Sequence, residues 1–183
     1  MPKVVEIWER LDAILASIDG ASAELGPPAT DAQVALCEAT LSISLPPDFR
    51  LSLQCHNGAG RILFLVGAYR LWPIAEIIKL NMKHRSLPGN NDFSSGDVTG
   101  RVKDLIYNPL WISIGDNGGD GGIAIDLDPG EKGSLGQILG LYEDETVVLA
   151  DSVTAFLERV VGEIESGART WDAAAGQWSD PNN

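Results

Sequence analysis

The feature that most constrains the fold of this chain is a change in the spacing of its apolar residues, which falls near residue 60. Up to that point apolar residues recur every three or four positions, which is typical of amphipathic helices. Beyond it, short apolar runs alternate with clusters of glycine, asparagine and aspartate, which is typical of strands joined by turns. Helices that precede a run of strands favour an α+β fold. We therefore expect a single domain with a central, mostly antiparallel sheet, flanking N-terminal helices and a C-terminal covering helix.

Five helices are predicted from apolar spacing and from residues that begin helices. Thr30 and Gln33 form a capping box, in which each side chain bonds to the backbone N–H of the other residue. Pro47 suits a first turn, where its missing N–H would be unpaired anyway. Asp151 and Ser152 precede the last apolar stripe as caps. The expected helices cover residues 4–18, 30–42, 47–55, 73–84 and 151–166.

Apolar runs outside these helices predict strands. The expected strands cover residues 62–66, 110–114, 123–127, 137–142 and 146–150. Residues 115–122 are rich in glycine and predict an extended hairpin tip. Residues 85–103 are polar and predict a long loop.

The chain of 183 residues is long enough to bury a core without disulfides or metals. Large aromatic residues on the apolar faces of their elements are predicted to be buried: Trp8, Phe49, Trp72, Trp111 and Phe156. One domain is expected over residues 1–168. A tail at residues 169–183 follows, and its two tryptophans leave open whether it docks on the domain.

Several features predict a cytoplasmic protein. No apolar run approaches the roughly 18–20 residues that a membrane span needs. Glu6 and Glu9 interrupt the apolar stretch that a signal peptide requires. Cys37 and Cys55 fall in apolar helical segments, so we expect buried, unpaired thiols rather than a disulfide.

Negative charge is concentrated in the second half of the chain. The net charge is −13, and residues 104–183 account for −12, with fifteen acidic residues against Lys132, Arg159 and Arg169. Such a surface does not favour nucleic acid, whose binding relies on cations that replace counterions. It would attract a basic protein and speed its association. An acidic surface that only keeps the protein soluble would give the same composition. A basic partner and solubility alone therefore both stay open as interpretations.

The glycine-rich tip has some features of a calcium loop. Counted from Asp116, positions 1, 5 and 6 of an EF-hand match, but position 3 is Gly118 and position 12 is Leu127, so the carboxylate cage is incomplete. A phosphate loop would need a helix N-terminus next, whereas a strand is expected here. We therefore expect a turn without a metal or cofactor.

The sequence contains no pattern typical of an active site. Cys55 and His56 are adjacent, but neighbouring side chains on a helix point about 100° apart. Asp126 and Asp128 lie two apart on a predicted strand and would face the same side, as an acid–base pair would. A solvated strand end is the commoner reason for such a pair. We expect no enzymatic activity.

A series of short motifs follows in order along the chain: Trp8 with Leu11, Pro28-Ala29-Thr30, Leu45-Pro46-Pro47-Asp48-Phe49, His56-Asn57-Gly58, Leu71-Trp72-Pro73-Ile74-Ala75-Glu76-Ile77, Trp111-Ile112-Ser113-Ile114-Gly115, Asn117-Gly118-Gly119, Ile125-Asp126-Leu127-Asp128-Pro129 and Gly136-Gln137-Ile138. In this order and spacing, together with the final helix, they resemble the SUKH superfamily over roughly residues 5–165. Each motif alone is weak, whereas their succession is fairly specific.

The resemblance implies an α+β fold and no enzymatic activity. Bacterial members of the superfamily are immunity proteins that bind and neutralise toxins, often nucleases, and fungal members are regulators of cell-wall assembly. The first expectation is a bacterial immunity protein whose partner is a basic toxin domain. The alternative is an intracellular regulatory or signalling scaffold, and a cryptic hydrolase or metal-dependent enzyme is a weaker third hypothesis.

Acidic residues on projecting turns are the candidates for contact with a basic partner, because hairpin tips project from a sheet while its central strands do not. The candidates are Asp116, Asp120, Asp126, Asp128, Glu131, Glu143, Asp144 and Glu145.

Overall fold

The computed structural model describes residues 1–18, 25–59, 69–86, 99–105, 107–119, 121–143, 145–173 and 177–179. The elements in these ranges are α1 (Lys3–Leu15), α2 (Asp31–Leu41), α3 (Pro47–Cys55), β1 (Arg70–Leu71), α4 (Ile74–Arg85), β2 (Trp111–Asp116), β3 (Gly122–Asp126), β4 (Ile138–Leu141), β5 (Thr146–Ala150), α5 (Val153–Glu165), β6 (Trp171–Asp172) and β7 (Gln177–Trp178). Within these ranges, no helix is both long and apolar enough to span a membrane.

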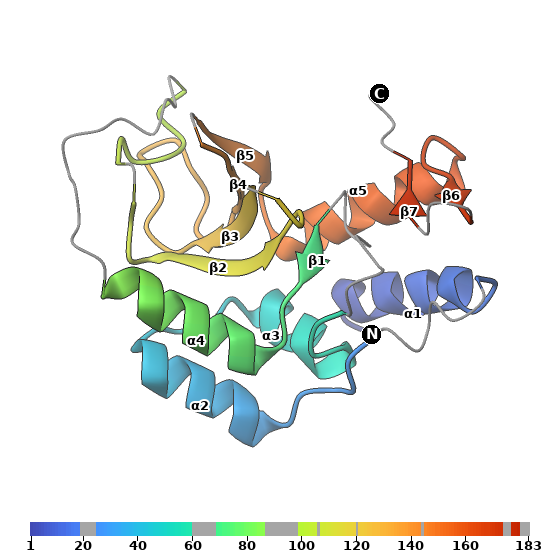
Figure 1. Ribbon diagram of the computed structural model, residues 1–183, viewed down its shortest axis with the longest axis horizontal. Coiled ribbons are helices and arrows are strands. Elements are labelled where there is room, and N and C mark those ends of the chain that lie inside the picture. The colour runs from blue at the N-terminus through green and yellow to red at the C-terminus, as the bar shows by residue number, and fades with distance from the viewer. Residues whose placement is uncertain are drawn as a thin grey trace.

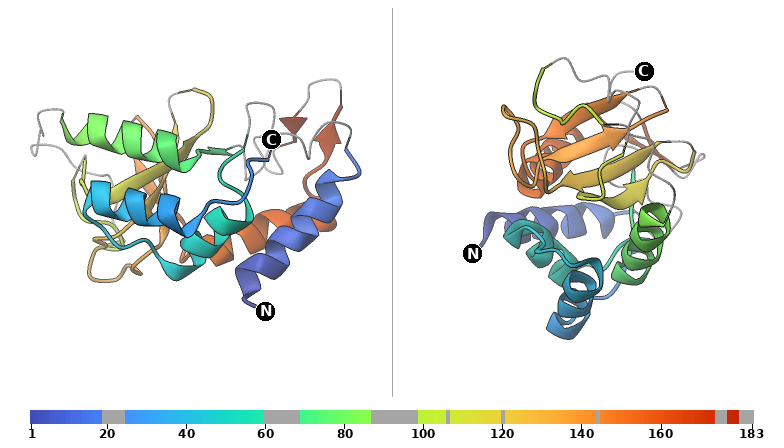
Figure 2. Two further views of the ribbon diagram at one scale, coloured as in Figure 1. Left: turned by 90° about the horizontal axis from the view of Figure 1, so that it is seen from below. Right: turned by 90° about the vertical axis from the view of Figure 1, so that its left-hand side faces the viewer.

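The structure confirms the expected α+β fold. Strands β1 to β5 form one antiparallel sheet in chain order, so that each strand pairs with the next. The helices lie on one side of this sheet (Figure 1), and the right-hand view of Figure 2 shows the same two layers from another side. α1 packs against α5, where Arg10 bonds to Glu158 and Glu165 at 2.9 and 2.6 Å.

Helix ends follow the local signals in the sequence. The predicted capping box is present: the Gln33 N–H donates to Thr30 Oγ1 at 3.2 Å, and the Thr30 N–H donates to Gln33 Oε1 at 2.8 Å. α3 begins and ends where it was predicted. α1 ends three residues earlier than expected, because the N–H groups of Ser17 and Ile18 bond three residues back rather than four.

The turn after α3 also starts α4. Gly58 has φ +86°, and a Cβ there would lie 2.5 Å from the backbone nitrogen of Pro73, so only glycine fits. The neighbouring Asn57 accepts a hydrogen bond from the Ile74 N–H at 2.8 Å. Pro73 has no side-chain acceptor, so Asn57 supplies the cap for α4 from outside the helix.

Four of the predicted strands correspond to β2, β3, β4 and β5 within two residues at each end. The strand predicted at 62–66 lies outside the described residues. β1 was not predicted; it consists of two residues that pair with the last two residues of β2. Of the loop expected at 85–103, residue 85 belongs to α4, and residues 86 and 99–103 are the rest of its described part.

The main core lies between the sheet and the helices. The five aromatic residues predicted to be buried are all at most 8 % exposed, which confirms that prediction. Trp8, Phe49, Trp72 and Phe156 belong to this core. Trp8 also donates its indole N–H to Ser52 Oγ at 2.9 Å, which satisfies a polar group that would otherwise be costly to bury.

A second, smaller apolar cluster covers the other face of the sheet. It consists of Val102, Trp111, Ala124 and Leu139, with Leu105 packed against it. The segment at 99–105 therefore lies over the face of the sheet that the helices leave open. Trp111 is buried here, and not under the helices.

The described part of the C-terminal tail, residues 169–173 and 177–179, docks on the domain, a point that the sequence left open. Trp171 and Trp178 pair across the β6–β7 hairpin with ring centroids 5.4 Å apart, and both pack against the main core. Arg169 is buried, and its guanidinium lies 2.9 Å from Glu163 of α5. The hairpin is thus attached by both apolar contact and an ion pair.

Candidate functional site

The candidate acidic residues lie at two opposite ends of the sheet, because each strand runs antiparallel to the next. Asp116 ends β2, and Glu143 and Glu145 lie between β4 and β5, so these three share the end where β2 joins β3. The other three described candidates lie at the opposite end: Asp126 ends β3, and Asp128 and Glu131 follow it. Asp120 and Asp144 lie outside the described residues.

Asp116 is held by three donors. Its Oδ2 accepts from Arg70 Nε at 2.8 Å and from the indole N–H of Trp72, and its Oδ1 accepts from the Gly118 N–H at 2.8 Å. Burial raises the pKa of this carboxyl, but the bonds from Trp72, Arg70 and Gly118 outweigh it and hold the pKa below its usual value. Asp116 is therefore ionised, and its charge is compensated within the fold.

Asp126 is fully buried, and partner contact through its side chain is not possible in this fold. Its carboxylate accepts from the Asp128 N–H at 2.9 Å and from Gln137 Nε2 at 2.8 Å. The same Gln137 nitrogen donates to the carbonyl of Arg101 at 2.9 Å. Asp126 and Gln137 thus tie the ends of β3 and β4 to the segment that covers the sheet.

Asp128 is bound by donors other than those of Asp126. Its carboxylate bonds to Lys103 Nζ and to Asn108 Nδ2, the latter at 2.9 Å. The bond from Lys103, followed by the bond from Asn108, lowers the pKa of Asp128. Burial raises the pKa of Asp126 despite its two donors. Each carboxylate has its own donors within the fold. The solvated strand end that the sequence favoured for this pair is wrong for Asp126, because its side chain is fully buried.

The remaining described candidates are solvent-facing. Glu131, Glu143 and Glu145 are exposed, and within the described part of the chain none of their side chains has a hydrogen bond or ion pair. Exposed charges of this kind contribute little to folding and are available to a partner. Two of the three lie at the end of the sheet that carries Asp116.

A pocket of about 280 Å³ opens at this same end. Its lining residues are Trp72, His84, Ser113, Gly115, Asp116, Gly121, Gly122, Leu141, Tyr142 and Glu143. They come from β2, β3, β4, α4 and the adjoining turns. Sequence reasoning found Asp116 and Glu143 but missed the aromatic walls, because Trp72, His84 and Tyr142 meet only when the sheet and α4 are assembled.

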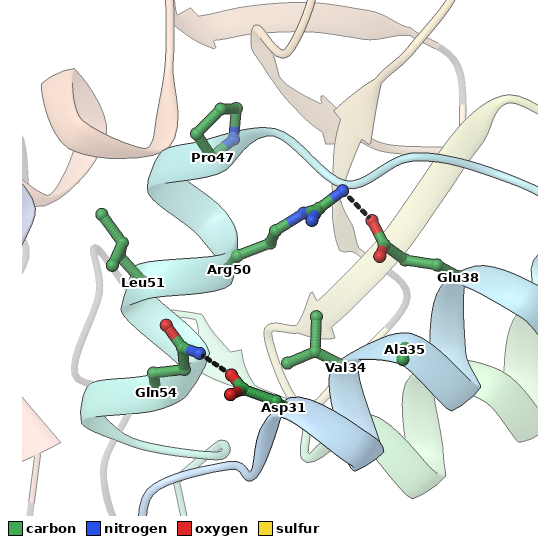
Figure 3. A pocket seen from close by; sticks show the side chains of 8 residues that line it. All are labelled: Asp31, Val34, Ala35, Glu38, Pro47, Arg50, Leu51 and Gln54. Atoms are coloured by element: carbon green, nitrogen blue, oxygen red, sulfur yellow. Dashed lines mark hydrogen bonds and ion pairs between the residues drawn. The ribbon is translucent and has the colours of Figure 1, made fainter.

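A second hollow, of about 480 Å³, lies between α2 and α3 (Figure 3). Its apolar lining includes Val34 and Leu51. Two polar contacts connect the helices across it. Arg50 forms an ion pair with Glu38 at 2.5 Å, and Gln54 donates a hydrogen bond to Asp31 at 2.6 Å. The polar groups around this hollow are therefore used to hold α2 against α3.

The two thiols are poor nucleophiles. Burial raises the pKa of Cys37 to about 11, and it also raises the pKa of Cys55. His56 contacts Asp12 at 3.0 Å and the Gly26 carbonyl at 3.2 Å. The sequence did not indicate this bridge between α1 and α3, because the residues are 44 positions apart.

Fold and surface together define a small α+β domain built on an antiparallel meander, with an aromatic and acidic pocket at one end of the sheet. The chain belongs to the SMI1/KNR4 family (SUKH-1), which it matches over residues 28–159. This match confirms the resemblance seen in the sequence. It extends from just before α2 into α5 and leaves out α1 and the C-terminal hairpin.

Two fungal proteins are similar to most of this chain. The "Cell wall biosynthesis/cell cycle regulator smi1" of Schizosaccharomyces pombe is 31% identical over 91% of this chain and 37% of its own length. The "KNR4/SMI1 homolog" of Yarrowia lipolytica is 26% identical over 91% of this chain and 31% of its own length. The chain thus spans about a third of the length of these relatives.

Proposed function

We propose that this chain is a non-enzymatic, intracellular regulatory domain that binds a basic protein partner at the end of the sheet formed by Asp116, Glu143 and Glu145. The fungal relatives support the regulatory part, since one of them is named as a regulator of cell-wall biosynthesis and the cell cycle. The single observation that carries the binding part is that the side chains of Glu143 and Glu145 are exposed at this end and have no partner among the residues that the structure describes.

The chemistry of the described side chains supports a binding role rather than catalysis. The two thiols are kept protonated by burial, and the carboxylates of Asp116, Asp126 and Asp128 are engaged with donors of the fold itself. Groups that are bound in this way stabilise the domain and are not free to transfer protons or attack a substrate.

The test compares two variants that remove the same kind of charge from different ends of the sheet. In Glu143→Gln/Glu145→Gln, captured basic partners should decrease in affinity purification from the source cells. The control Glu131→Gln, at the other end, should capture them as the wild type does. With a purified partner, added salt should slow the association of the wild type much more than it speeds dissociation. Equal capture by both variants contradicts the proposal.

Toxin neutralisation is the second candidate. The net charge of −12 in residues 104–183 favours it, because a nuclease carries a cationic surface for its substrate and an acidic inhibitor complements that surface. Co-expression with a toxin gene linked to this gene separates the two candidates. Protection of the cells, together with tight binding of the purified toxin domain, favours immunity; capture of endogenous proteins without protection favours the regulator.

A further inference from the structure

Among the described residues that line the pocket at the end of the sheet, one carries an unpaired charge. Asp116 is saturated by its three donors, and Arg70 is bound to it. Glu143 also lines the pocket, is exposed and has no partner within the described residues. The free charge that the described lining of this pocket presents to a ligand is therefore the carboxylate of Glu143.

The walls of the pocket are aromatic. Trp72 and Tyr142 line it, and the polar atom of each is already bonded inside the protein: the Trp72 N–H to Asp116 and the Tyr142 hydroxyl to Tyr69. Tyr142, which is 40 % exposed, offers ring surface to a ligand, whereas Trp72, which is 8 % exposed, offers only the small part of its ring that the core leaves uncovered. His84 also lines the pocket, and burial, followed by the nearby charge of Lys83, lowers its pKa, so that it is a neutral ring at pH 7.

The floor of the pocket is open because Gly122 has no side chain. A Cβ at this position would meet only the Gly115 carbonyl oxygen at 3.7 Å and Leu141 Cβ at 3.8 Å, which are ordinary contacts. Gly122 pairs with Asp116 on one side and with Leu141 on the other. A larger residue here would fill the hollow while the backbone conformation stays allowed.

We propose that this pocket receives the guanidinium group of an arginine side chain on the protein partner. A guanidinium group is planar, stacks on aromatic rings and forms paired hydrogen bonds with a carboxylate, and the pocket combines ring walls with the free Glu143. An ammonium group forms no such stacked, two-pronged contact and fits this lining less well. This inference rests on the proposed function, since it names the partner group that the acidic end of the sheet recognises.

The experiment titrates the full chain with three small probes and follows backbone and indole N–H resonances by NMR. N-acetyl-arginine amide should shift the Trp72 indole and the Gly122 amide saturably. N-acetyl-citrulline amide has the same shape without the charge and should leave them in place, and N-acetyl-lysine amide should bind more weakly than the arginine probe. Citrulline or lysine probes that bind as tightly as the arginine probe overturn the assignment.

Three variants locate the binding. Glu143→Gln should weaken the arginine probe about fivefold, as expected for loss of one charged contact near the surface. Glu131→Gln should leave the affinity unchanged. Gly122→Val should abolish binding while the melting temperature stays near that of the wild type, because it fills the floor. Unchanged affinity in Glu143→Gln or Gly122→Val overturns the proposal.

The two proposals fail in distinguishable ways. If the arginine probe does not bind but Glu143→Gln/Glu145→Gln still loses the basic partner, the binding surface stands and the arginine pocket is wrong. If the probe binds in the pocket but no basic partner is captured, the pocket stands as an arginine site and the regulatory proposal is wrong.

Discussion

At the scale of single residues, the carboxyl group of Asp126 couples protonation to folding. Burial raises its pKa above the ordinary value of 3.8, despite the N–H donors of Asp128 and Gln137. Between that value and the raised one, the folded protein holds a proton that the unfolded chain has lost. The contribution of this group to stability is therefore full below the ordinary pKa and falls as the pH rises through this window.

Replacement of Asp126 isolates this effect. Asp126→Asn has no carboxyl group at this position and therefore lacks the fall in stability that Asp126 causes as the pH rises. The amount by which the unfolding free energy of the wild type exceeds that of the variant should thus shrink as the pH rises from about 3 to 6 in urea titrations. Asp128→Asn is the matched control with the opposite sign, because the pKa of Asp128 is lowered and its contribution is lost as the pH falls. Parallel pH profiles of wild type and Asp126→Asn contradict this prediction.

Trp111 is the anchor of the second apolar cluster. It is 3 % exposed and packs with Val102, Ala124 and Leu139. Trp111→Ala should cost about 3–5 kcal/mol in unfolding free energy, as truncations of large buried aromatic residues do. Leu135→Ala, at a residue that is 73 % exposed, should change it by less than about 0.5 kcal/mol. A loss below about 1 kcal/mol for Trp111→Ala would show that the cluster contributes little.

At the scale of elements, β1 covers only the last two residues of the β2 edge, and a side chain of α4 pairs with the edge next to them. Asn81 of α4 accepts from the Ser113 N–H at 3.0 Å and donates to the Ser113 carbonyl at 2.8 Å, as a neighbouring strand would. Both residues are buried. Asn81 also donates to the carbonyl of Ile77, so its side-chain amide connects α4 to the sheet.

Loss of this amide should destabilise the edge of the sheet. Asn81→Ala leaves the buried N–H and carbonyl of Ser113 unpaired and should cost about 2–4 kcal/mol. The amide hydrogen of Ser113 should then exchange with solvent faster than those of β3. Asn81→Asp, which retains an acceptor, should protect this amide better than Asn81→Ala; equal exchange in both variants contradicts the assigned role.

The glycine-rich turn after β2 uses its own oxygen atoms. Asn117 Oδ1 accepts from the N–H groups of Gly119 and Gly121 at 2.9 and 3.0 Å, and Asp116 Oδ1 accepts from Gly118. Millimolar calcium or magnesium should therefore leave the melting temperature almost unchanged, since a specific site would stabilise the fold by mass action. A saturable rise of several degrees in thermal unfolding would restore the calcium-loop hypothesis.

At the scale of the whole molecule, the C-terminal hairpin tests the domain division that the sequence suggests. A chain that ends after residue 168 loses Arg169, Trp171 and Trp178, which pack on α5 and the main core. We expect it to fold as one cooperative unit with stability lower by about 2–3 kcal/mol, since both rings are only partly buried. A chain that ends after residue 179 is the control. Unchanged stability of the shorter chain would show that the hairpin is dispensable.

Much of the fold could be predicted from the sequence because its signals are local. The periodicity of apolar residues and the caps at Thr30 and Ser152 depend on neighbours within one helical turn. The apolar runs also predicted four of the strands, and the order of helices and strands along the chain favoured a mostly antiparallel sheet. The same local signals also indicated the burial of five aromatic residues, since each lies on the apolar face of its own element.

Only part of the candidate site could be predicted from the sequence. Glu143 is exposed in a turn, as its place between two strands predicts. Asp126 looked equivalent, but the register of β3 and β4 and the covering segment at 99–105 bury it. No local pattern specifies which face of a sheet a distant segment covers.

By itself, the sequence determined the five helices, four of the strands, the α+β order and the family of this protein, because apolar spacing, caps and motifs act over a few residues. Only the tertiary structure decided which acids are free, which are held by donors from elsewhere, and which aromatic rings meet at the end of the sheet. Asp48, for example, accepts from the N–H of Thr154 at 2.9 Å across 106 positions and so caps α5 from α3. Contacts of this kind exist only after the chain has folded, because the residues that make them share no local pattern.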